Sequence, residues 1–242
     1  MTHPYAKSMT SSTATMAAST STMKGRLFAA ALALFLIGSL AGTTMADGAL
    51  PSLDSPDLAQ GPYATMHMML QKTILSINVA TIEVRVDKPT QTHLAGLARG
   101  QQYSDALAQQ LANVAIGAER AVVQMRFKRN ISLNRWMGVV RENLEQARKA
   151  GLINADLERQ VGQGLPQWFS ALKDRGYEKD DRLVYAVGPS SLRTVVVSAG
   201  GQVLVDRADG EQGTRRVVLA SYFAYGSEFR EPLLRSLFQA GQ

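Results

Sequence analysis

The sequence contains no cysteine and only three histidines in a chain of 242 residues. Without cysteine there is no disulfide, no thiolate nucleophile, no cysteine zinc site and no lipid-modified cysteine. The histidines, His3, His67 and His93, are far apart in the sequence. A histidine metal site would need carboxylates that no spacing identifies. The sequence therefore predicts no metal and no other cofactor.

A strong charge of one sign is also missing. The formal net charge is +6, but Lys7, Lys24 and Arg26 lie before residue 47, where there is no acidic residue. The remaining chain has 23 basic and 20 acidic residues. No basic run is interleaved with aromatic residues beyond the short stretch Arg126–Arg129, so no nucleic-acid partner is predicted. A hydrophobic content of 45% indicates a globular protein rather than a disordered one.

The first 46 residues have the pattern of an export signal. Met23–Arg26 supplies a basic start, and the apolar run Leu27–Gly42 is 16 residues long, whereas a membrane-spanning helix needs about 20. Small residues precede a cleavage site that we expect after Ala46, and Met23 could be the true translation start. We therefore expect a periplasmic or secreted protein. The alternative is an uncleaved segment that anchors the chain in a membrane.

Residues 47–62 include Pro51, Pro56, Gly61 and Pro62, residue types that interrupt helices and strands, and their apolar residues show no periodicity. This composition predicts a linker. We expect one domain over residues 63–242. Its length of about 180 residues is enough to bury roughly 70% of the surface of the unfolded chain, so a disulfide is not needed for stability.

Residues 122–151 predict a strand that turns directly into a long helix. Val123, Met125 and Phe127 alternate with polar residues, as in a half-buried strand. Ser132 is an N-cap residue, and Gly151 lies where a helix ends most easily. The apolar residues between them recur at spacings of three and four, so they share one helix face: Leu133, Trp136, Val140, Leu144 and Ala147.

The other expected elements, in chain order, are a strand over 74–86, a helix over 103–117, a three-strand meander over 181–206 and a last helix over 232–240. A short helix from Asn154 is expected to end near Gly162–Gly164, and Pro166 is expected to open another. Residues 215–219 could form a further strand or begin the closing segment. This order predicts an α+β protein, with an antiparallel sheet and helices massed on one face.

Four landmarks in this layout resemble the chalcone isomerase-like domain found in exported bacterial proteins. They are Ile77–Glu83, Met125–Ser132 with the Trp136 helix, Tyr177–Leu183, and Tyr222–Gly226 before Pro232. The resemblance covers residues 70–238. It implies an open-faced sandwich, in which a long curved antiparallel sheet is covered on one face by a layer of helices.

The resemblance also implies a ligand between the two layers, flavonoid-like in some members and a fatty acid in others. The plant enzymes use an arginine just upstream of the first long strand, helped by Thr and Tyr hydroxyls that hold a water. Here residues 67–73 contain no arginine, and Lys72 is their only cation, which is not equivalent. Fatty-acid-binding members hold the carboxylate with an arginine and a tyrosine, for which Arg126 and Tyr185 are candidates here.

Each candidate has a plainer interpretation. Arg126 and Arg129 could clamp an anion, or they could face solvent, because their apolar neighbours already claim the core face. Trp136 could line a ligand cavity, yet a tryptophan on such a helix stripe is more often part of the core, and the same holds for Tyr185.

The sequence thus predicts an exported, non-catalytic domain that binds a small apolar or amphipathic acid such as a fatty acid. The candidate ligand-binding residues are Arg126, Tyr185, Trp136 and Lys72. One alternative is an intramolecular lyase or isomerase acting on an enone-like substrate. The other is an envelope module that binds a protein partner. A membrane contact is expected only through the N-terminal segment, if that segment is not cleaved.

Overall fold

The computed structural model describes residues 50–72, 77–210 and 212–239. The strands are β1 (Thr65–Lys72), β2 (Ile77–Val86), β3 (Ala121–Phe127), β4 (Arg182–Val187), β5 (Leu192–Val197) and β6 (Val203–Asp209). The helices are α1 (Lys88–Ala98), α2 (Asp105–Ile116), α3 (Leu133–Lys149), α4 (Ala155–Trp168), α5 (Gln212–Phe223) and α6 (Arg230–Gln239), with a short 3₁₀ turn at Ser170–Leu172.

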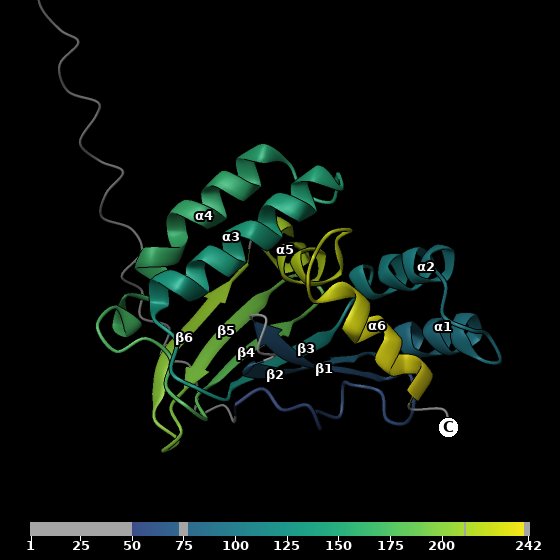
Figure 1. Ribbon diagram of the computed structural model, residues 1–242, viewed down its shortest axis with the longest axis horizontal. Helices are drawn as coiled ribbons and strands as arrows, with labels where there is room; N and C mark the ends of the chain where they lie inside the picture. Colours follow the sequence, from purple (N-terminus) through teal and green to yellow (C-terminus); the bar gives the residue numbers. More distant parts are fainter. Residues whose placement is uncertain (1–49, 73–76, 211, 240–242) are drawn as a thin grey trace, which may run out of the picture. The chain divides into compact units, whose positions relative to one another are not determined.

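The six strands form one antiparallel sheet in the order β1-β2-β3-β4-β5-β6, so every strand pairs with its neighbours in the sequence. Helices α1 and α2 are inserted between β2 and β3, and α3 and α4 between β3 and β4. The helices cover one face of the sheet, with α3 and α4 over the β4–β6 side and α6 beside β1 (Figure 1). This confirms the predicted α+β class, an open sheet with helices on one face.

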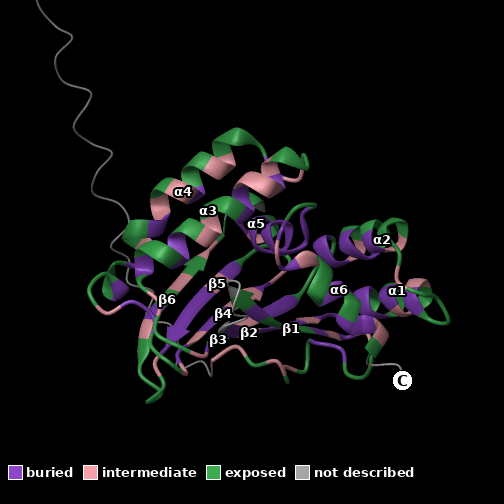
Figure 2. Cartoon of the chain, viewed as in Figure 1, coloured by how far each residue is buried: buried purple, intermediate pink, exposed green. Residues whose placement is uncertain are grey.

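The β3–α3 junction has the predicted local structure. Val123, Met125 and Phe127 are buried on the helix-covered face of β3, whereas Arg126 between them is exposed. The side chain of Ser132 accepts the backbone N–H of Arg135 and so caps α3. The inner side of this junction is buried, and the outward side of α4 above it is exposed (Figure 2). The strand and the helix therefore contribute walls to the same interior.

The opposite face of the sheet carries a smaller apolar cluster. Leu58 packs there with Val122 and Val184. The N–H of Ala59 donates to the carbonyl oxygen of Val86 at 3.0 Å, which ties the segment to β2. Residues 50–62, the described part of the expected linker, thus lie against the sheet.

Two elements were not predicted. In β1, Met66, Met68 and Leu70 are buried and alternate with outward residues. Because the outward residue Met69 is also apolar, the alternation of apolar and polar residues that marks a strand is not visible in the sequence. Helix α1 begins directly after β2, over residues for which no element was predicted. Its N-cap Asp87 accepts the N–H of Thr90, and a proline occupies the first turn.

The prediction of two helices around Gly162–Gly164 was wrong, because α4 runs through Pro166 without a break. Proline has no N–H, so it leaves the carbonyl oxygen of Gly162, four residues earlier, without its helical partner. Arg141 on α3 donates to that oxygen at 3.5 Å. The neighbouring helix thus supplies the donor that the proline lacks. Residues 215–219, for which a strand or the start of the closing segment was expected, belong to helix α5.

Candidate functional site

A cavity of about 310 Å³ lies between the sheet and helices α3, α4 and α5. Its floor comes from the inward residues of β3 to β6, including Met125, Phe127, Tyr185, Leu192, Thr194 and Val205. Its roof comes mainly from Trp136, Val139, Val140 and Leu144 on α3 and from Val161, Leu165 and Trp168 on α4. Val217, Val218 and Tyr222 on α5 close one side. Such a mostly apolar space with few polar groups is typical of a ligand site.

The charged residues that line the cavity are all arginines: Arg129, Arg135 and Arg207. Arg207 is already engaged, because it pairs with Asp209 at 2.8 Å and its guanidinium lies 4.0 Å from the centroid of the Trp168 ring. No hydrogen bond or ion pair joins the guanidinium of Arg129 or Arg135 to another described residue. Two free cations therefore border a space whose lining includes no carboxylate.

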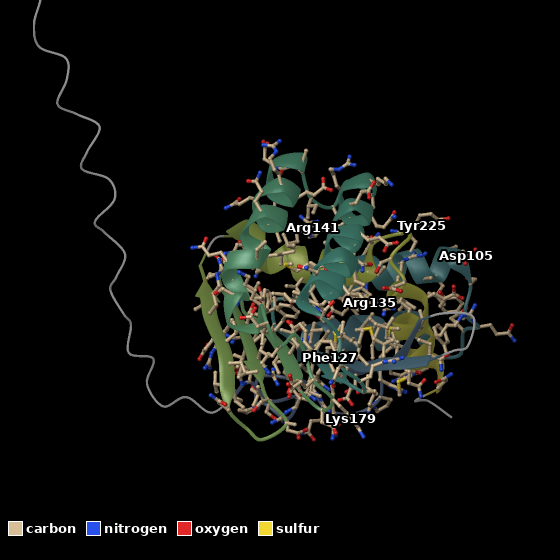
Figure 3. The ribbon with its side chains drawn as sticks, turned by 60° about the vertical axis from the view of Figure 1, so that its left-hand side comes forward. Asp105, Phe127, Arg135, Arg141, Lys179 and Tyr225 are labelled. Atoms are coloured by element: carbon tan, nitrogen blue, oxygen red, sulfur yellow. The ribbon has the colours of Figure 1, made fainter. Side chains whose placement is uncertain are left out.

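Arg129 and Arg135 also mark where the cavity opens. They and Asn130 are the exposed members of a lining that is otherwise buried or half-buried. In Figure 3, Arg135 comes from α3 and Phe127 from the sheet, the two layers that enclose the cavity. An anionic group at this opening would meet both guanidinium groups while remaining partly in water.

The opening is held by contacts with the chain before β4. Ile131 and Tyr177 exchange two backbone hydrogen bonds, of 2.8 and 2.9 Å. The side-chain oxygen of Asn130 accepts the N–H of Lys179 at 2.9 Å. Gly176 has a φ of 67° and packs so closely on Ile131 that no side chain would fit. The loop that carries Arg129 is therefore fixed to the rest of the fold.

Three tyrosines place hydroxyl groups in or beside the cavity. Tyr185 and Tyr222 line it, and neither hydroxyl has a hydrogen-bond partner among the described residues. Tyr177 is fully buried, and its hydroxyl also lacks a partner. Burial raises the pKa of all three phenols above the usual value, and for Tyr177 the nearby Tyr185 and Tyr222 raise the pKa further. The group is thus neutral at ordinary pH.

The candidate residues from the sequence do not all meet at this cavity. Trp136 and Tyr185 line it. Arg126 does not line it; its Nε donates to the Asp180 carboxylate at 2.9 Å, on the other face of β3. Lys72 ends β1, and its side chain lies outside the described part of the structure. The structure therefore does not bring Arg126 and Tyr185 together around one carboxylate.

Arg135 and Arg207 are lining cations that sequence reasoning missed, and of the two Arg135 is the one at the opening whose side chain has no partner among the described residues. A local signal for Arg135 was present, because the residue lies in the first turn of a capped helix, next to the strand end that carries Arg129. Among the described residues, no helix is long and apolar enough to cross a membrane. Within the same residues, no group of three or more histidines and acids is arranged to hold a metal ion.

No family model matches the chain, and no curated protein matches it. One similar solved structure is that of a fatty-acid binding protein from Arabidopsis thaliana. It is 11% identical to this chain, with a TM-score of 0.49, and the match covers 79% of this chain and 93% of that one.

Proposed function

We propose that this protein is a chalcone isomerase-like domain that binds a small amphipathic acid, such as a fatty acid. The apolar part of the ligand would lie in the cavity between the sheet and α3, and its carboxylate would lie at Arg129 and Arg135. The observation that carries the proposal is the pair of unengaged arginines at the opening of an apolar cavity with no acid in its lining.

The physical argument separates the two ends of the ligand. Burial of apolar surface contributes roughly 25 cal/mol per Å², which favours a hydrocarbon tail in the cavity. A carboxylate would be costly to bury there without a partner, but guanidinium groups bind carboxylates through two parallel hydrogen bonds. Because Arg129 and Arg135 are exposed, the acid group keeps water on one side, and its binding weakens with salt.

A matched ligand pair tests the charge at the opening. Oleic acid and oleyl alcohol share one tail, so the delipidated protein should bind the acid at least about tenfold more tightly. Changing both Arg129→Gln and Arg135→Gln should bring the two dissociation constants close together. The control is Arg126→Gln, which removes one arginine charge outside the cavity and should preserve the preference. Equal binding of acid and alcohol by the unchanged protein would contradict this role for the arginines.

We also infer that the protein is exported. The segment expected to direct export, residues 1–46, lies outside the described residues. The inference is supported by its sequence alone, and the mature protein should begin at Asp47. Amino-terminal sequencing of protein purified from its native source tests this, because a chain that keeps residues before Asp47 would instead fit the anchored alternative.

A further inference from the structure

Three phenol groups deep in the fold are not used by the binding mode proposed above. Tyr185 lies on β4, Tyr222 on α5, and Tyr177 precedes β4. The first two line the cavity, and the third stacks on the lining residue Phe127, with ring centroids 4.2 Å apart. The hydroxyls of Tyr185 and Tyr222 therefore add polar groups to a mostly apolar lining that also includes Asn143, Thr194 and Ser221.

None of the three hydroxyls has a hydrogen-bond partner among the described residues. Buried polar atoms in native proteins almost always have one, so each exception needs an explanation. Of the three, the Tyr177 hydroxyl is enclosed by protein, whereas Tyr185 and Tyr222 line the cavity and their hydroxyls are not enclosed, so the partner of these two belongs to whatever occupies the cavity. Tyr177 is fully buried, so bulk water does not satisfy its hydroxyl.

The partner must be an uncharged oxygen. A phenol donates one hydrogen bond through its O–H and accepts others, but it carries no positive charge to balance a carboxylate. The cationic side chains of the lining are Arg129 and Arg135 at the opening and Arg207, which is paired with Asp209. An ionised acid buried at the phenols would stay uncompensated and costly.

Tyr185 is also set apart from the opening. Tyr185 pairs with Val123 on β3, and Arg129 follows the other end of that strand. The six residue steps from position 123 to position 129 span on the order of 20 Å along an extended strand. An acid held at Arg129 and Arg135 thus reaches Tyr185 only with a later part of its chain.

We propose that the ligand is an oxygenated chain acid, with its carboxylate at the opening and a hydroxyl, keto or ether oxygen within the chain bound by Tyr185 and Tyr222. The proposal rests on the function proposed above and adds the chemical class of the ligand. The ligand oxygen then supplies the hydrogen-bond partner that the hydroxyls of Tyr185 and Tyr222 lack among the described residues.

Oleic acid and ricinoleic acid test this, because they share chain length, double bond and acid group and differ in one mid-chain hydroxyl. Calorimetric titration of the delipidated protein should give a dissociation constant about tenfold lower for ricinoleic acid, which corresponds to about 1.4 kcal/mol. The combined change Tyr185→Phe and Tyr222→Phe should reduce the ratio of the two constants to about one. Tyr225→Phe, at a residue 74% exposed and absent from the lining, should leave the ratio unchanged (Figure 3).

Equal constants for the two acids in the unchanged protein would overturn the inference and leave the proposed function standing. The same holds if the double phenylalanine variant, shown to be folded by its circular dichroism, keeps the preference. If neither acid binds, both the inference and the proposed function fail. A preference for the hydroxylated acid that follows Tyr185 and Tyr222 supports both.

Discussion

The ring of Tyr177 stacks on the ring of Phe127 with centroids 4.2 Å apart, and this contact holds a hydroxyl without a hydrogen-bond partner among the described residues. Two backbone hydrogen bonds to Ile131 fix the same residue beside the opening of the cavity. Tyr177 therefore connects the loop that carries Arg129 with the buried phenols. Substitutions at Tyr177 and at the adjacent Gly176 test this arrangement.

Replacing Tyr177 with phenylalanine should stabilise the ligand-free protein. In the unfolded chain this hydroxyl is hydrogen-bonded to water, and in the folded protein it has no hydrogen-bond partner among the described residues. The change removes the hydroxyl and keeps the stacked ring. An unsatisfied buried polar group costs about 1–3 kcal/mol, so the free energy of unfolding should rise by about 1–2 kcal/mol in urea titrations. Tyr225→Phe should change it little. A less stable Tyr177→Phe protein would mean that the hydroxyl is hydrogen-bonded in solution.

Gly176 should tolerate alanine much less well than Gly151 does. Both have a φ near 70°, where a side chain costs about 1–2 kcal/mol. At Gly151 the added methyl group would meet nothing within 4 Å, whereas at Gly176 it would overlap the carbonyl oxygen of Ile131. We expect Gly176→Ala to lower the free energy of unfolding by at least about 1 kcal/mol more than Gly151→Ala. An equal decrease in the free energy of unfolding for both variants would show that the contact between Ile131 and Tyr177 shifts to accommodate the methyl group at no energetic cost.

Asp87 should make stability depend on pH in acid. Burial acts to raise the pKa of its carboxyl, but the N–H groups of Arg120 and Thr90, at 2.8 and 2.9 Å, outweigh it and lower the pKa. A carboxyl whose folded pKa is below its unfolded value of 3.8 stabilises the fold above that value. That contribution is lost as the pH falls through the lower, folded pKa.

The variant Asp87→Asn should therefore be less stable than the unchanged protein near neutral pH, by about 1 kcal/mol, because an amide has one acceptor oxygen where the carboxylate accepts the N–H groups of Thr90 and Arg120 on two. The gap should narrow below about pH 4, where the aspartate is protonated in the unfolded chain and then in the folded one. Urea unfolding at a series of pH values measures this. A difference in the free energy of unfolding between the two proteins that stays constant below about pH 4 would rule out a lowered pKa for Asp87.

Filling the cavity should prevent binding without unfolding the protein. Val140 on α3 is half-buried and lines the cavity, so Val140→Phe places a ring in space that the ligand tail would occupy. We expect affinity for oleic acid to fall at least about tenfold, with little loss of stability. Val203→Phe adds the same volume on β6 at a residue 48% exposed and outside the lining, and should bind normally. Unchanged binding by Val140→Phe would locate the ligand elsewhere.

The sheet was predictable where the sequence alternates cleanly. Val123, Met125 and Phe127 leave one interpretation for β3, and the cap at Ser132 starts α3 where the structure has it. Strand β1 was missed because Met69 places an apolar side chain on its outward side. Helix α4 was predicted as two helices because a proline inside a helix leaves a carbonyl oxygen without its helical partner. The sequence does not show that Arg141, on another helix, donates to that oxygen.

The candidate site was predictable only in part, because the role of an arginine depends on which acid reaches it. Asp180, 54 residues along the chain, pairs with Arg126, and no acid among the described residues pairs with Arg129. The sequence places Arg126 and Arg129 on the same short basic run and does not distinguish them. Trp136 and Tyr185 could be assigned to a cavity or to the core, and only the packing of α3 over β4 decides.

The most direct test uses the chain's two tryptophans, Trp136 and Trp168, which both line the cavity. Titrating the delipidated protein with oleic acid should change the tryptophan emission and saturate at one ligand per chain. The change should be lost in Val140→Phe and weakened when Arg129 and Arg135 are both changed to glutamine. Emission that stays constant while the protein remains folded, with no heat of binding in the same titration, would contradict the account.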